Sequence, residues 1–549
     1  MSAVGLKRLT DWIEKLAGVI AREDEPDFNH LAPFLSKPEL AFYILDMLFD
    51  LTEEDAEHAS SHYSACVYAL DVCMTQLKYT KDSGGKLANK IVNNIMTNIA
   101  DLMQQQMHSL NFWLPVLNIF YLAKIEMSED LKDAYMTLAS EEEDEGSYYY
   151  DQEDVRETIR EQIQDASDLS IFEIAEIFFA QGHAMTADFF ADLMVDLYNI
   201  EEGHDIALLL LLHPKDDVRA VVTATFDSLI KKITLSAASL MRLKIIRDWY
   251  PCHCHTQFDY WVRVQEMKGV VAQKQQAMPL LKIDASEVDG RGSQGIFIHI
   301  KTNKQYFLCG MLLKQGYGIK DVWITPAISS AELAEYNEKI NEVNLTIRSV
   351  TLNYFQALIS HFLEGMIKEN KTPDLQLLQI QELLGISLKP KALEPGAIIE
   401  HLIKSILPPI TSENLEASFK RSSAWIHKPF TESWYMEDAN IDVLVNQHAS
   451  IVKGVKVCAV EEAVVAVFQE VFEPKRQQWL FHFLWFALWA NAKPSKRDKF
   501  GVDSALIAHS IYTGMPLKDI PLMQKICHET VINSIETMNE RRTYLTPLG

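Results

Sequence analysis

Apolar residues recur every three or four positions along most of this chain, and this spacing places them on one face of an α-helix. The helical spacing ends near Met278, and short runs of β-branched and aromatic residues then continue to about Pro326. Beyond that point the helical spacing returns and persists to the end of the sequence. The pattern therefore predicts a mainly α protein, a multi-helix bundle and solenoid-like array with one small antiparallel β insert near residues 280–326.

Four runs inside the insert have the composition of β-strands, with Thr302-Asn303-Lys304 placed as a hairpin turn between the second and third. The runs are Leu280–Asp284, Gly295–Ile300, Gln305–Leu313 and Val322–Thr325. Their length is enough for a three- or four-stranded antiparallel sheet. The next segment, Ser330–Glu364, is predicted to be one or two helices.

A turn between two apolar runs in the middle of the chain carries a family resemblance. The run Ile206–Leu212 is followed by His213-Pro214-Lys215-Asp216-Asp217-Val218-Arg219. Pro214 cannot extend a helix, Asp217 can accept hydrogen bonds from the next first turn, and Val218 begins an apolar stripe. Residues 206–231 thus resemble one HEAT repeat, which implies an α-solenoid. A second resemblance, to an uncharacterised bacterial family, rests on the segment Lys314–Trp323.

These patterns divide the chain into five parts. We expect an N-terminal helical bundle (1–139), an acidic loop with a linker helix (140–169), a HEAT-like array (170–279), the β insert (280–326) and a C-terminal helical domain (327–549). Eight of the fourteen residues of Glu141–Asp154 are acidic. This stretch is either a solvated loop or a docking segment for a basic partner.

Charge is distributed very unevenly. The chain has a formal net charge of −25, and residues 1–214 contain 13 Lys and Arg against 40 Asp and Glu. Nucleic-acid binding requires clustered basic side chains that neutralise phosphates, so an acidic first part argues against a nucleic-acid partner. It favours a basic protein partner, or serves solubility alone.

Cysteine usage and apolar run lengths indicate a soluble cytoplasmic protein. The seven cysteines are scattered and odd in number, which fits reduced thiols better than a disulfide framework. Charged residues interrupt the first twenty positions, so no secretory signal is expected. The longest apolar runs are shorter than the roughly 20 residues that cross a bilayer, and no membrane span is predicted.

The β insert contains the one glycine string of the form G-x-G-x-x-G, formed by Gly290, Gly292 and Gly295. In a dinucleotide site this string opens a helix, whereas here a strand follows it. The context resembles the glycine-rich hairpin that covers phosphates in protein kinases, which implies Lys314 as the phosphate-pairing lysine. No other kinase motif accompanies it, so the alternative is a glycine-rich β-turn.

Two groups of residues could hold zinc. Glu54, His58, His62 and Cys66 recur every four positions, so one continuous helix would place them on one face. The string Cys252-His253-Cys254-His255 combines the two usual zinc donors in a predicted turn between helices. For the first group the alternatives are a polar helix face or histidines bonded to neighbouring groups. For the second the alternative is a structural or solvent-facing turn. No other cofactor is expected.

An aromatic block occupies Trp479–Ala492, and basic residues follow it. Aromatic side chains surround this predicted helix on all sides, which is typical of a helix buried in a core. A membrane-surface helix is the alternative.

The sequence contains no catalytic set of the common kinds. It therefore favours a cytoplasmic scaffold or adaptor that binds another protein. The alternative is an enzyme or ligand-binding protein that holds a phosphorylated ligand with Gly290, Gly292, Gly295 and Lys314. The sequence indicates no oligomeric state.

Overall fold

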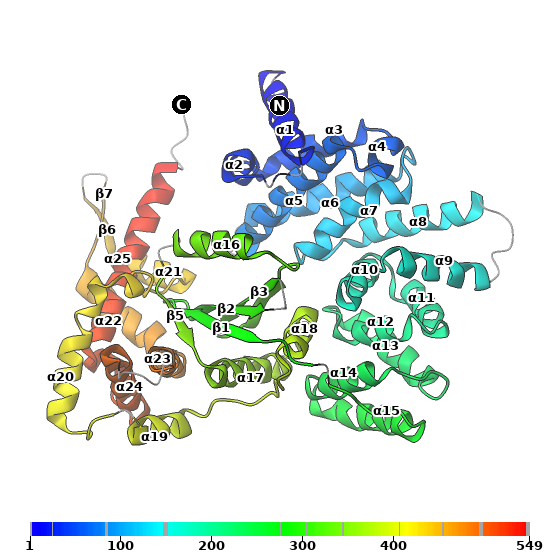
Figure 1. Cartoon of the computed structure of the whole chain (residues 1–549). Coiled ribbons are helices and arrows are strands. Elements are labelled where there is room, and N and C mark those ends of the chain that lie inside the picture. Colours follow the sequence, from blue (N-terminus) through cyan, green and yellow to red (C-terminus); the bar gives the residue numbers. More distant parts are fainter. Residues whose placement is uncertain are drawn as a thin grey trace. The chain divides into compact units, whose positions relative to one another are not determined.

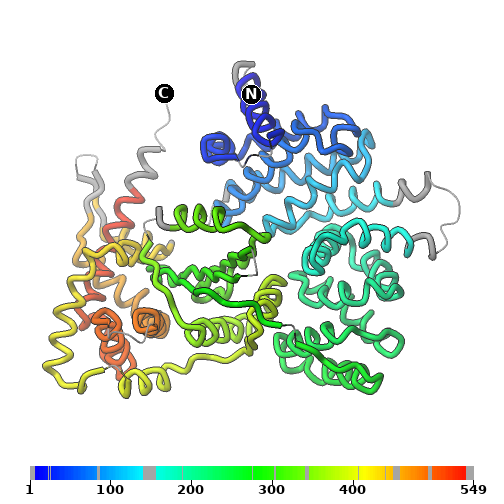
Figure 2. The backbone as a smooth tube through the Cα atoms, in the orientation of Figure 1, coloured from blue at the N-terminus to red at the C-terminus, as the bar shows by residue number. Residues whose placement is uncertain are grey.

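The structure of the chain is a computed structural model that describes residues 3–22, 24, 26–82, 86–145, 152–274, 276–301, 305–342, 345–405, 407–452, 455–492 and 498–544 (Figure 2). It is 67% helical. The described residues form 25 α-helices and a five-stranded antiparallel sheet, which confirms the predicted fold class. The chain divides into two compact units, Met1–Ser236 with Met267–Val270, and Ala237–Glu266 with Val271–Gly549.

The first unit is entirely helical over its described residues (Figure 1). Its elements in chain order are α1 (Ala3–Ile20), α2 (Phe28–Ser36), η1 (Pro38–Leu40), α3 (Ala41–Phe49), α4 (Glu53–Glu57), α5 (Ser61–Asp82), α6 (Lys86–Met103), α7 (Leu110–Leu122), α8 (Glu129–Glu145), α9 (Gln152–Asp165), α10 (Ile171–Ala184), α11 (Ala187–Asn199), α12 (His204–Leu209), η2 (Leu210–Leu212) and α13 (Asp216–Leu229).

Helix α5 lies at the centre of the N-terminal bundle and contacts α1, α2, α3, α6 and α7. Small and medium-sized side chains such as Ala65, Cys66 and Ala69 are buried along it, which lets several helices approach its axis. Side-chain caps define neighbouring helix starts: Ser109 accepts from the Phe112 amide and Ser170 from the Glu173 amide. The predicted amphipathic helices therefore pack as a bundle around α5.

The HEAT-like segment forms the expected helix pair with one difference in its cap. The first helix, α12, continues as the 3₁₀ helix η2 to Leu212, ahead of Pro214, and Val218 is buried on α13. However, α13 begins at Asp216, so Asp217 lies inside the first turn instead of preceding it. The side chain of Asp217 accepts a hydrogen bond from the Val218 amide at 2.8 Å. Buried Arg219 holds the turn by donating to the carbonyl oxygens of His213 and Pro214.

The second unit surrounds the sheet with helices (Figure 1). Its elements are α14 (Ala237–Asp248), η3 (Cys252–Cys254), α15 (His255–Met267), β1 (Leu280–Ser286), β2 (Ser293–Lys301), β3 (Tyr306–Lys314), β4 (Gly318–Ile324), α16 (Ser330–Glu342), β5 (Ile347–Val350), α17 (Leu352–Lys368), α18 (Leu375–Leu384), α19 (Pro395–Ser405), α20 (Ser412–Ser422), η4 (Trp425–His427), η5 (Pro429–Thr431), α21 (Ala439–Gln447), β6 (Ala449–Val452), β7 (Val455–Cys458), α22 (Val460–Val467), the π-helical η6 (Phe468–Phe472), α23 (Arg476–Ala490), α24 (Lys499–Tyr512), η7 (Leu517–Asp519) and α25 (Pro521–Tyr544).

The sheet has the strand order β4-β3-β2-β1-β5. Strands β1 to β4 confirm the four predicted runs, while the predicted hairpin turn at 302–304 lies outside the described residues. The prediction that Ser330–Glu364 is entirely helical was wrong. Its residues Ile347–Val350 form the edge strand β5, in which Ser349 lies opposite Asp284 of β1. The sheet therefore extends beyond the expected end of the insert.

Helix α23 is buried on all sides, as its aromatic pattern predicts. Eleven of its fifteen residues are buried, Trp479, Trp485 and Trp489 among them. A hydrogen-bonded group joins it to the sheet: the side-chain oxygen of Gln294 accepts from Tyr354 Oη at 2.8 Å and from Trp485 Nε1 at 3.1 Å. The amide nitrogen of Gln294 donates to the Ser286 carbonyl at 2.7 Å. One buried glutamine thus connects β2, α17 and α23.

Among the described helices, none has both the length and the apolar composition needed to cross a bilayer.

Candidate functional site

The β1–β2 loop brings together most of the residues of the predicted phosphate site. Gly290 and Gly292 lie in this loop, and Gly295 lies just inside β2, opposite Leu312. Lys314 ends β3, opposite Ser293. The loop and the neighbouring strand end are therefore the place where a ligand of that kind would be expected.

The amides of this loop already have acceptors from the protein itself. The carboxylate of Asp289 accepts from the Arg291 amide at 2.9 Å and from the Ser293 amide at 2.7 Å. The Gly292 amide donates to the Asp289 carbonyl at 3.0 Å, and the Gly290 amide to Ser433 Oγ at 3.2 Å. A phosphate bound to such amides would have to displace a carboxylate that carries the same sign of charge. The geometry gives the phosphate prediction no support.

The first glycine is required by packing. A Cβ atom at Gly290 would lie 1.8 Å from the carbonyl oxygen of Ser433, so a side chain would displace the loop or the neighbouring backbone. Two further contacts hold the same surfaces together: Trp434 Nε1 donates to the Val288 carbonyl at 3.1 Å, and Arg291 forms an ion pair with Glu437. The glycine lets the loop pack closely against residues 433–437.

Burial shifts the pKa of two carboxyl groups of the loop, those of buried Glu287 and partly buried Asp289. Burial raises the pKa of Glu287, and one of its oxygens has no hydrogen-bond partner among the described residues. Burial also raises the pKa of Asp289. The backbone amides that donate to its carboxylate lower this pKa, and so do the positive charges of Arg291 and Lys314, but burial has the larger effect. Perturbed carboxyl groups of this kind occur at functional sites and also in structural networks. Here Asp289 serves the loop's own structure.

The residues predicted as a metal site do not share one helix face. Helix α4 ends at Glu57, and Ala59 has a φ of 43°, which breaks the helix before α5 starts at Ser61. The assumption of one continuous helix through Glu54, His58, His62 and Cys66 was wrong. Cys66 is buried, and burial raises the pKa of its thiol to about 12.

The signal for this break was present in the sequence as two serines after Ala59. Ser60 Oγ accepts from the Tyr63 amide at 3.2 Å, which caps the new helix. Within the part of the chain that the structure describes, no three His, Cys, Asp or Glu side chains are grouped so that they could hold a metal ion. Zinc at this place stays a prediction for elemental analysis.

The second zinc candidate lies, as predicted, in a turn between two helices. Cys252–Cys254 form the short helix η3 between α14 and α15. His255 Nε2 is 2.8 Å from the Tyr250 carbonyl oxygen, so this nitrogen is occupied. Both cysteines are free thiols, with Cys252 exposed.

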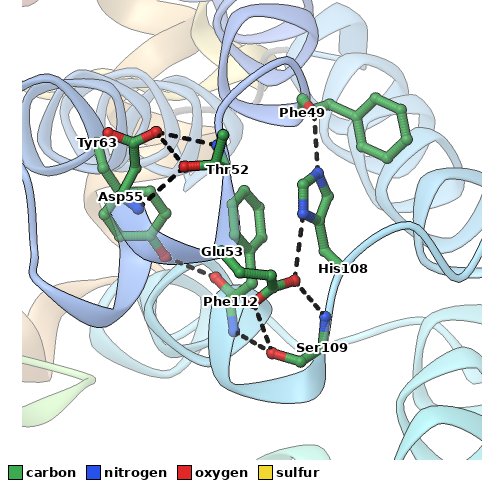
Figure 3. A network of polar contacts seen from close by, with 8 residues as sticks. All are labelled: Phe49, Thr52, Glu53, Asp55, Tyr63, His108, Ser109 and Phe112. Carbon is green, nitrogen blue, oxygen red and sulfur yellow. Dashed lines mark hydrogen bonds and ion pairs between the residues drawn. The ribbon is translucent and has the colours of Figure 1, made fainter.

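A polar group that the sequence did not reveal joins α4 to the start of α7 in the first unit (Figure 3). The carboxylate of Glu53 accepts from the Ser109 amide at 2.6 Å and from Ser109 Oγ at 2.8 Å, and it lies 3.3 Å from His108 Nδ1. The other ring nitrogen of His108 lies 2.8 Å from the Phe49 carbonyl oxygen.

This group contains Ser, His and Glu but has the wrong geometry for nucleophilic catalysis. The Ser109 hydroxyl donates to Glu53, accepts from the Phe112 amide and has no hydrogen bond to the histidine (Figure 3). A carboxylate at a helix N-terminus is favourable because it meets free amides and the positive end of the helix dipole. The group therefore fixes the start of α7.

A second unforeseen polar group lies on one face of the sheet. Asp284 is 2.8 Å from Lys282 Nζ and accepts from Ser349 Oγ at 2.7 Å, while His299 Nε2 is 3.9 Å away. Burial lowers the pKa of His299 to about 4, so this ring is neutral near pH 7. The cross-strand register that assembles these residues involves β5, which the sequence pattern did not predict.

The described residues form a mainly α protein of two units, with one five-stranded and one two-stranded antiparallel sheet. Three domain models match its sequence: the Y4lR second domain at residues 186–269, a domain of unknown function (DUF7401) at 275–390 and the Y4lR C-terminal helical domain at 396–535. The model that covers residues 206–231 describes the Y4lR second domain, so the HEAT resemblance stays a prediction.

One curated relative is the uncharacterized protein y4lR of Sinorhizobium fredii, which is 27% identical over 300 residues. The aligned region covers 53% of this chain and 54% of the relative, so the chain spans about half the length of the curated relative it matches. No solved structure matches the chain significantly. These findings support the predicted similarity to an uncharacterised bacterial family.

Proposed function

We propose that the protein is a cytoplasmic adaptor whose first unit binds a basic protein partner. The observation that carries this proposal is the distribution of charge between the two units. The first unit contains 18 Lys and Arg against 43 Asp and Glu, whereas the second contains 33 of each. The entire net charge of −25 is therefore located in the first unit and the second is neutral.

A charge of this size produces a long-range field that accelerates encounter with an oppositely charged surface. Many of the acidic side chains are well placed to act on a partner. Glu161, Asp165, Asp192 and Glu202 are exposed, and none has an ion pair with a described residue. A helical array of HEAT-like pairs would present them on an extended surface, which suits protein recognition.

The test compares two variants of the full chain that change charge equally. In the first, Glu161, Asp165 and Asp192 become the corresponding amides. In the control, the exposed residues Glu413, Glu416 and Glu470 of the neutral unit become glutamine. Each tagged protein is used to capture partners at low and moderate salt, and recovered proteins are quantified by mass spectrometry.

We expect the wild type and the control to recover the same basic proteins at low salt, with recovery falling as salt rises because screening weakens exposed charges. The first variant should recover several-fold less of them. Equal recovery by both variants, or partners that are insensitive to salt, would contradict the proposal.

A further inference from the structure

A small cavity of about 70 Å³ lies inside the second unit between α14, the segment before β1 and the end of α18. Ala238, Met241 and Ile245 form its apolar wall and follow one another on the same face of α14. The opposite wall contains Gln381 and Glu382, and Lys274 lies at its edge. The cavity is thus apolar on one side and polar on the other.

Three contacts hold the walls in place. Arg242 forms a buried two-point ion pair with Glu382, with nitrogen–oxygen distances of 2.8 and 3.0 Å. The Gln273 amide donates to the Ala237 carbonyl at 3.0 Å, and the Met278 amide to the Leu383 carbonyl at 2.8 Å. Each wall is therefore fixed to another by a hydrogen bond, which makes the cavity a pre-formed site.

The polar groups around the cavity select for a negatively charged acceptor. Both oxygens of Glu382 are bound to Arg242, so its charge is compensated. Gln381 is only 1% exposed, its side-chain oxygen accepts from the Leu388 amide, and its amide nitrogen has no partner among the described residues. Lys274 is exposed and forms no ion pair with a described residue. The amide nitrogen of Gln381 has no accessible surface, so the uncompensated cation of Lys274 is the group that would gain from a carboxylate.

The volume limits the size of the ligand. A cavity of about 150 Å³ accommodates benzene, so about 70 Å³ holds roughly three carbon-sized atoms. We infer that the second unit binds a short-chain monocarboxylate of three or four carbons, with its aliphatic tail of two or three carbons inside the cavity against α14 and its carboxylate outside, beside Lys274. This site is independent of the proposed adaptor surface.

The test measures binding of sodium propionate and sodium butyrate to the full chain by saturation-transfer NMR and thermal shift. Sodium chloride of equal ionic strength, propionamide and propylammonium serve as comparison compounds. We expect saturable binding of the carboxylates with a dissociation constant of about millimolar, as ligands of this size allow. The uncharged and cationic analogues should bind at least several-fold more weakly.

Variants locate the site. Ala238→Leu fills the cavity and should abolish binding, while Lys274→Met should weaken it about two- to fivefold, as expected for loss of an exposed charge pair. Lys420→Met, at an exposed lysine elsewhere in the second unit, is the matched control and should bind as the wild type does. If Ala238→Leu does not fold, the carboxylate affinity of Lys274→Met compared with that of Lys420→Met still tests the inference.

Three results would overturn the inference. The first is no saturable carboxylate binding to the wild type, and the second is undiminished binding in the filled variant. The third is equal affinity in the two lysine variants.

Discussion

Several buried histidines show how position in the fold determines the chemistry of a single residue. His213 Nε2 lies 3.0 Å from the Phe179 carbonyl oxygen, and its other ring nitrogen accepts from the Lys215 amide at 3.1 Å. His183 Nε2 lies 2.9 Å from the Ile125 carbonyl oxygen. Burial lowers the pKa of His183 to about 4 and that of His213 to about 3, so both rings are neutral in the folded first unit.

This depression predicts a loss of stability in acid. In the unfolded chain a histidine binds its proton near pH 6.5, whereas these two remain neutral until about pH 4 and 3. Protons therefore favour the unfolded chain below pH 6.5, and stability is lost as pH falls from there toward the folded pKa values. Each histidine should cost about 1.4 kcal/mol per pH unit in this window.

Urea unfolding between pH 7 and pH 5 measures the effect. The variant His183→Gln should lose less stability over this range than the wild type, because one of the depressed groups is gone. His253→Gln, at an exposed histidine in the second unit, is the control. Parallel pH profiles for the wild type and His183→Gln would refute the assignment.

At the scale of secondary-structure elements, contacts between distant segments stabilise the five-stranded sheet and the buried helix α23. Strand β5 has only four residues, and its hydrogen bonds come from β1, more than sixty positions earlier in the chain. Helix α23 carries polar indole groups into the core, where Trp489 Nε1 donates to the Ala285 carbonyl and Trp485 Nε1 to Gln294. These two indole nitrogens are tolerated there because each finds a partner, whereas Trp479 Nε1 and His482 Nε2 on the same helix have none among the described residues.

Gln294 should consequently contribute more than a single hydrogen bond. Gln294→Leu removes the acceptor of Tyr354 and Trp485 and the donor to Ser286, so it leaves three buried polar groups without this partner. We expect a loss of about 3–6 kcal/mol in the free energy of unfolding. Tyr354→Phe removes one of these bonds and should cost about 1 kcal/mol. Urea unfolding followed by tryptophan fluorescence measures both, and similar losses would disprove the connecting role of Gln294.

At the scale of the whole molecule, charge and fold divide the chain at almost the same place. The first unit is helical and strongly acidic, and the second combines helices with the sheet and is neutral. Like charges within one compact body repel each other, and salt weakens that repulsion over distances of about 10 Å at 0.1 M. The two units should therefore differ in their response to ionic strength.

Hydrogen exchange with mass spectrometry can measure the two units separately in the intact chain. Raising sodium chloride from about 0.02 to about 0.3 M should increase amide protection in the first unit, because screening reduces its self-repulsion. Protection in the neutral second unit should change much less. An equal response in both units would show that charge distribution does not govern their stability.

The sequence by itself determined the elements whose formation is local. Apolar spacing predicted the helices, β-branched and aromatic composition predicted strands β1 to β4, and the aromatic pattern predicted that α23 is buried. Tertiary structure alone decided β5, the grouping of Asp284 with Ser349, and the hydrogen bond from the Gly290 amide to Ser433. The helix break at Ala59 had a local signal in Ser60, which caps the next helix. The recurrence of potential metal ligands every four residues suggested one continuous helix instead. Pairing across a sheet and contacts between separate loops depend on residues distant in sequence, and a pattern of neighbours carries no information about them.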